Sequence, residues 1–196
     1  VNLKERIRMH IIKKSLMLAA VITSGAYGMN CDNTNVQTVF NLISSRANLM
    51  QSVAADKYTQ NKAPYAAAQE LKVLNNIEKI AASQKLPLYP LLTFAQIQMD
   101  FSKQIEQYWL DKWHENPQSF NQKAVPLDQI RQEIHSIDSK LYPAIKAAIP
   151  ELKSCPITEL SGLFSHSLKA IQGIPKKPDY NQIMIHALVV VAQNAE

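Results

Sequence analysis

The stretch FNLISSRANLMQSVAADKY, residues 40–58, combines an apolar helical pattern with two cations. Residues at helical spacing lie on one face of an α-helix. Steps of three and four align Val36, Val39, Ile43, Arg46, Met50, Val53 and Lys57. Five of these seven residues are apolar and predict a buried face that also carries Arg46 and Lys57. Because burying an unpaired charge is strongly unfavourable, both cations are expected to find partners on other helices.

The rest of the chain also has the pattern of helices. Apolar residues recur at helical spacing over about residues 65–83, 91–114, 127–149, 157–172 and 180–193. Asp32 and Asn33 are candidate N-caps of the first helix. Pro-containing breaks separate the helices, and the longest break spans residues 115–126. The sequence predicts an all-α, single-domain array of about six helices.

The N-terminal segment has the pattern of an export signal. Basic residues precede the apolar run SLMLAAVI, and small residues follow around Ala26 and Gly28. This order is typical of a secretory signal peptide, and the run is too short for a stable membrane span. An N-terminal membrane anchor is the alternative. We expect residues 1–28 to be a signal peptide and residues 29–196 to be a periplasmic or secreted domain, without stable membrane insertion after cleavage.

Charge and cysteine content limit the possible partners. The first 28 residues hold five Lys and Arg and one Glu, so 16 basic and 15 acidic side chains remain. A nearly balanced charge gives no support for binding to nucleic acid. Cys31 and Cys155 are the only cysteines. They either form a disulfide in an oxidising compartment or remain free thiols, and the sequence leaves both possibilities open.

Motifs for metal, nucleotide or covalent chemistry are absent from the sequence. The five histidines are scattered without HExxH spacing, and the four glycines form no phosphate-binding loop. In the Ser165–Ser167 triplet SHS, neighbouring side chains on a helix would point in different directions. We therefore expect no metal and no cofactor.

Polar residues interrupt the apolar stripes of the next two predicted helices as well. Gln69 lies on the second helix, and Ser102 and Glu106 lie on the third. One interpretation is a buried ion network in which Glu106 pairs with Arg46 or Lys57. The other is a pocket between helices with excess positive charge, suited to an anionic ligand. The pattern alone does not separate them.

The chain resembles the secreted (periplasmic) chorismate mutases of the all-helical, gamma (AroQ-type) subclass. The resemblance lies in LISSRANLMQSVAADKY, QELKVL, QMDFSKQIEQYW and LDQIRQEI. That family has an Arg and a Lys eleven residues apart on the first long helix. It has a Ser or Thr followed four residues later by Gln or Glu on a later long helix, and a further Arg after a Pro-containing linker. The matching residues here are Arg46, Lys57, Ser102, Glu106 and Arg131.

The resemblance implies a cofactor-free Claisen rearrangement of chorismate to prephenate in a site inside one chain of a homodimer. It implies catalytic roles for Lys57, Glu106 and Arg46. Residues 29–149 would form the catalytic half and residues 150–196 the C-terminal helices. Substrate-binding roles are implied for Arg131, Ser102, Gln69, Val73 and Lys72.

One position departs from the family pattern. The family has an Arg where QELKVL has Gln69, and Gln supplies neither a charge nor a bidentate fork for a carboxylate. Lys72, one turn further along, is a candidate substitute. The departure supports an alternative function, an exported protein of the same fold that binds a small anion without catalysis. A helical interaction protein with a purely structural ion network is a third possibility.

Overall fold

The computed structural model describes residues 31–123, 125–176 and 179–196 and confirms the predicted all-α fold. Within these residues there are eight α-helices, one 3-10 turn and no strand. The predicted signal peptide lies outside the described residues. The elements are α1 (Thr34–Asn48), α2 (Met50–Thr59), α3 (Ala67–Gln84), α4 (Leu88–Glu115), η1 (Pro117–Ser119), α5 (Leu127–Ala147), α6 (Ile149–Ser154), α7 (Ile157–Ser167) and α8 (Tyr180–Gln193).

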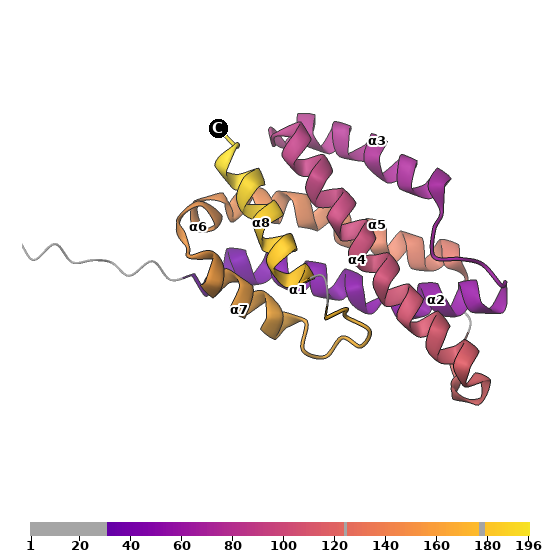
Figure 1. Cartoon of the computed structure of the whole chain (residues 1–196). Helices are drawn as coiled ribbons and strands as arrows, with labels where there is room; N and C mark the ends of the chain where they lie inside the picture. Colours follow the sequence, from indigo (N-terminus) through magenta and orange to yellow (C-terminus); the bar gives the residue numbers. More distant parts are fainter. Residues whose placement is uncertain (1–30, 124, 177–178) are drawn as a thin grey trace, which may run out of the picture.

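The first predicted helix is observed as α1 and α2, which follow one another along one line (Figure 1). The backbone of Leu49 between them keeps helical angles, φ −72° and ψ −14°. Its carbonyl accepts from the Val53 N–H at 3.1 Å. Asn33 caps α1 by accepting from the Val36 N–H at 3.0 Å. All seven residues of the predicted stripe are therefore buried on one continuous face.

Prolines account for two boundaries that differ from the sequence prediction. Helix α4 begins at Leu88 rather than Leu91 because Pro90 falls in its first turn, where backbone N–H groups have no partner within the helix. The predicted fourth helix ends at Ala147, and α6 begins after Ala148. Pro150 has no N–H to continue the hydrogen-bond ladder of α5, so the chain starts a new helix there.

Helix α4 is the central element of the fold. It packs against α2, α3 and α8, while α5 packs against α1, α2 and α3 (Figure 1). One buried apolar cluster joins the N-terminal helices to α7 and α8, with Phe40 of α1 in ring contact with Phe164 of α7 at 5.2 Å between centroids. Although α4 has 28 residues, no helix in the described part of the chain is long and apolar enough to cross a membrane.

A disulfide joins the start of α1 to the end of α6. Cys31, just before α1, is bonded to Cys155, just after α6, and their Cα atoms are 5.7 Å apart. Both cysteines are buried in the apolar cluster. The structure thus resolves the choice between a disulfide and free thiols in favour of the disulfide.

Candidate active site

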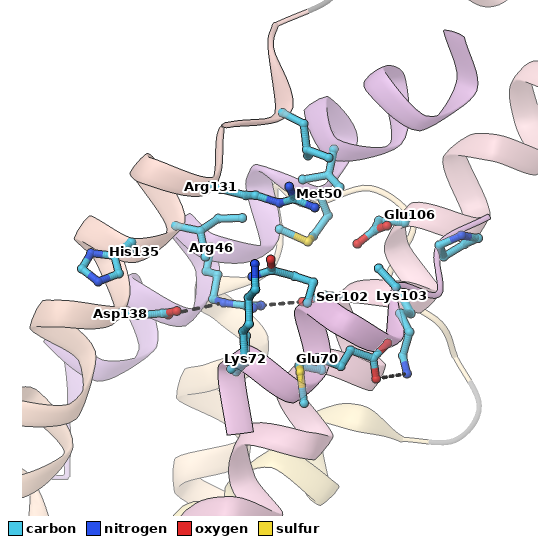
Figure 2. Close-up of a pocket in the computed structure, with 18 of the residues that line it drawn as sticks. Arg46, Met50, Glu70, Lys72, Ser102, Lys103, Glu106, Arg131, His135 and Asp138 are labelled. Atoms are coloured by element: carbon cyan, nitrogen blue, oxygen red, sulfur yellow. Dashed lines mark hydrogen bonds and ion pairs between the residues drawn. The ribbon is translucent and has the colours of Figure 1, made fainter. Parts of the chain in front are cut away.

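A cavity of about 540 Å³ lies among α1, α2, α3, α4 and α5 (Figure 2). Its volume is within the range of small-molecule sites, roughly 300–1,000 Å³. Its apolar wall includes Met50, Val53 and Met99. All eight residues to which the resemblance gives a catalytic or substrate-binding role also line it, namely Arg46, Lys57, Gln69, Lys72, Val73, Ser102, Glu106 and Arg131.

Arg46 is held between two helices at one end of the cavity. Its Nη1 donates to the Ser102 hydroxyl of α4 at 2.6 Å, and that hydroxyl donates to the Gln98 carbonyl at 2.8 Å. Its Nε lies 3.4 Å from Oδ1 of Asp138 on α5, an ion pair (Figure 2). Burial raises the pKa of Asp138, although the charges of Arg46 and His135 oppose this shift.

Lys57 and Glu106 form a buried pair at the other end. The Lys57 ammonium donates to Glu106 Oε2 at 2.5 Å and to the Pro64 carbonyl at 2.6 Å. Burial raises the pKa of Glu106, against the nearby charges of Lys57, Arg46 and Lys103, which lower it. The predicted ion pair between Glu106 and Lys57 therefore exists, and the same two residues also line a cavity.

Four predicted residues occupy more open parts of the cavity wall. Lys72 is exposed, and three are half-buried, namely Gln69, Val73 and Arg131. In Figure 2, Lys72 extends from α3 toward Arg46 and Arg131. Arg131 also pairs at 3.5 Å with Asp128, whose side chain is 91% exposed, and such exposed pairs contribute little.

The cavity carries more positive than negative charge. Five Lys and Arg side chains and three carboxylates line it, a surplus of two positive charges. Lys103 pairs with Glu70 at 3.2 Å and with Asp100 at 2.9 Å. Burial lowers the pKa of Lys103, but these carboxylates outweigh burial and raise it. Since Arg46, Lys57 and Lys103 each have a carboxylate of the cavity beside them, Lys72 and Arg131 supply the surplus.

Three further charged residues of the cavity were not predicted from the sequence, namely Asp138, Lys103 and Glu70. Asp138 lies seven residues after Arg131, so helical spacing places it on the same face of α5 and was the signal available. Glu70 and Lys103 directly follow Gln69 and Ser102, and nothing in the pattern distinguished them from surface charges. In the described residues, no group of His, Cys, Asp and Glu is arranged to hold a metal ion.

The fold is shared with solved chorismate mutases. The secreted chorismate mutase from Yersinia pestis aligns with a TM-score of 0.64 and 21% identity, over 81% of this chain and 96% of that one. The enzyme from Burkholderia thailandensis aligns with a TM-score of 0.63 and 19% identity, over 82% and 99%. That from Burkholderia phymatum aligns with a TM-score of 0.63 and 13% identity, over 82% and 98%. No protein-family model and no curated protein matches the chain. At these identities the likeness establishes the fold alone.

Proposed function

We propose that the protein is a chorismate mutase that converts chorismate to prephenate without a cofactor. The observation that carries the proposal is the cavity, in which buried Arg46 and Lys57 and a surplus of two positive charges face an apolar wall. Chorismate is a dicarboxylate, and its rearrangement is intramolecular. The reaction needs a site that holds a compact conformer and stabilises charge developing on the ether oxygen, and no nucleophile.

In this proposal the arginines bind the two carboxylates. Arg46 presents the part of its guanidinium that Ser102 and Asp138 leave unused, and Arg131 approaches from α5. Lys72 adds positive charge on the side of α3, where Gln69 offers only an amide. In the same proposal, Val73 packs against the apolar part of the substrate, and Ser102 contacts the ring hydroxyl.

Lys57 and Glu106 stabilise the developing charge. An ammonium has three N–H groups, and two of those on Lys57 are held by Glu106 and Pro64. The third is then available to the ether oxygen. Glu106 also donates to that oxygen when it is protonated, and burial, which raises its pKa, favours the protonated form.

The protonation of Glu106 makes turnover depend on pH. Because the neutral carboxyl is the donor and its pKa is raised by burial, we expect kcat to fall as pH rises through that pKa. Glu106→Gln keeps a neutral donor at every pH, so its profile should be flat over the same range. The measurement is kcat from pH 4 to pH 9 for both proteins. A wild-type profile as flat as that of the variant would contradict this role.

A direct assay tests the proposed function. Loss of the chorismate ultraviolet absorbance is followed with purified protein, and prephenate is identified in the product. An anion-binding protein without catalysis is the second candidate, and Gln69 on the cavity wall favours it. Binding of an oxabicyclic dicarboxylic acid, a mimic of the transition state, without turnover would select that function. If the protein shows neither activity nor binding of this acid, the third possibility remains, a helical interaction protein with a structural ion network.

Adding the missing charge separates the two leading functions. Gln69→Arg places a guanidinium on the cavity wall, and we expect kcat/KM to rise about tenfold because a charged bidentate donor replaces an amide. In the binding-only alternative, the variant binds the bicyclic acid more tightly and stays inactive. Asn75→Arg adds the same charge outside the cavity on α3 and should change neither quantity. A fall in kcat/KM for Gln69→Arg would contradict a substrate-binding position.

The disulfide supports an exported protein. Disulfides persist in oxidising compartments, and Cys31–Cys155 joins segments 124 residues apart. We propose a periplasmic or secreted location, with residues 1–28 removed, and assembly as a homodimer. Intact mass and sedimentation velocity of the protein recovered from the periplasm or the medium test these proposals.

A further inference from the structure

One carboxylate of the cavity, half-buried in its wall, has no task in the proposed mechanism. Asp138 lies on α5, its side chain is 20% exposed, and its Oδ1 is 3.4 Å from Arg46 Nε. That oxygen accepts no hydrogen bond from the described residues. The ion pair with Arg46 therefore offsets part of the cost of burying its charge, and loss of that partner would be unfavourable.

Asp138 contributes one of two anchors of Arg46. The side chain of an arginine has many conformations, and each anchor removes some of them. Ser102 on α4 holds Nη1 at 2.6 Å, and Asp138 on α5 attracts Nε from another direction (Figure 2). Together they fix the guanidinium in the cavity wall before a ligand binds.

Asp138 also sets the charge that a ligand meets. With all three carboxylates ionised, the side chains that line the cavity carry a surplus of two positive charges. Loss of the Asp138 charge adds one positive charge to the surplus, whether or not Glu106 is protonated. Asp138 therefore weakens the attraction for anions at the end of the cavity where it orients Arg46.

We propose that Asp138 is a positioning residue that holds the Arg46 guanidinium for the reaction and limits the affinity of the cavity for anions. Removing Asp138 should therefore change two kinetic constants for different reasons, KM through binding and kcat through the chemical step. Losing the charge strengthens binding of substrate and product alike, whereas losing the orientation of Arg46 slows the chemical step. A residue that only supported the fold would lower activity without strengthening binding.

The test compares three variants in steady-state kinetics. For Asp138→Asn we expect KM to fall about threefold to tenfold, because a repulsive charge is removed close to the ligand. We expect kcat to fall about tenfold, because Arg46 loses one anchor. Glu133→Gln makes the same charge change at an exposed position of α5 outside the cavity and should leave both constants within about twofold of wild type.

Asp138→Glu restores the charge at a longer reach. It should return KM to within about twofold of wild type and leave kcat between wild type and Asp138→Asn. Any other pattern for Asp138→Asn, including unchanged constants or a higher KM, overturns the proposal. Thermal unfolding is measured for each variant. If Asp138→Asn does not fold, Asp138→Glu decides, and a kcat equal to that of wild type overturns the proposal.

The kinetic readout rests on the proposed function, so calorimetric binding of the oxabicyclic dicarboxylic acid is measured in parallel. If the wild type binds this acid without turnover, the proposed function fails. The affinity of each variant for the acid then tests the role of Asp138. Tighter binding by Asp138→Asn, with Glu133→Gln unchanged, then supports the charge-limiting role. Equal or weaker binding overturns it, and a wild type that does not bind the acid overturns both proposals.

Discussion

Lys57→Ala is expected to lower kcat by about 10²–10³-fold, equivalent to about 3–4 kcal/mol, the effect of removing one preorganised donor from a developing oxyanion. Lys57 is buried, and its ammonium is oriented by Glu106 Oε2 at 2.5 Å and the Pro64 carbonyl at 2.6 Å. No solvent molecule replaces a donor fixed in this way without reorganisation. The measurement is the rate of chorismate loss at saturating substrate.

Two controls separate chemistry from folding in this variant. Lys79→Ala removes an exposed lysine of α3 outside the cavity and should leave kcat unchanged. The second control is the pH dependence of stability. Burial raises the pKa of Glu106, and the charge of Lys57 lowers it, so removing Lys57 should raise this pKa further. A raised pKa in the folded state gives stability at low pH that is lost as pH rises, so Lys57→Ala should lose more stability at pH 8 than at pH 5. A kcat within threefold of wild type would remove Lys57 from the site.

Removing the disulfide is expected to lower the free energy of unfolding by roughly 5 kcal/mol, the loop-entropy value for a crosslink of this span. Cys31 and Cys155 are 124 residues apart, and their bond joins the start of α1 to the end of α6. The double variant Cys31→Ser and Cys155→Ser is preferred, because either single variant leaves a free thiol. The measurement is urea unfolding of variant and wild type.

A reductant provides the matched control for the disulfide prediction. Dithiothreitol should lower the free energy of unfolding of the wild type to about that of the variant, and it should leave the free energy of unfolding of the variant unchanged. Neither cysteine lines the cavity, so kcat of the folded variant should match that of wild type. A loss below about 1 kcal/mol would contradict the entropic role that the chain-crosslink argument assigns to this bond.

The helices could be predicted from the sequence because each one buries a continuous apolar stripe. The stripe from Val36 to Lys57 was predicted to lie on one helix. The break at Leu49 alters the hydrogen-bond pattern without moving Arg46 and Lys57 to different faces. Pro90 was interpreted as a break, although a proline is well accommodated in a first turn. The predicted start of this helix was therefore wrong because Pro90 was taken to precede the helix and not to lie in its first turn.

The cavity could be predicted only in part. Helical spacing aligned Arg46 with Lys57 and Ser102 with Glu106, but spacing within one helix cannot show that two helices face each other. The contact between Arg46 and Ser102 joins residues 56 positions apart. Asp138 was missed because α5 is rich in charged residues and its one carboxylate at the cavity has the same sequence signature as its exposed ones. Whether two cysteines form a disulfide depends on the redox state of the compartment and on their distance in the fold. Their spacing in the sequence shows neither.

Because α1 and α2 follow one another along one line, the helix fixes the separation and the relative direction of Arg46 and Lys57 in the cavity. Arg46 and Lys57 are eleven residues apart, about three turns and about 16 Å of helix, with the cavity-lining Met50 and Val53 between them. One residue inserted between 47 and 56 would turn Lys57 by about 100° around the helix axis and away from Glu106. The described residues of the loop between α4 and α5, 116–123 and 125–126, do not line the cavity, so a change of length there would not rotate Lys57 about its helix. Changes in chain length should therefore be tolerated in that loop and not between the two cations.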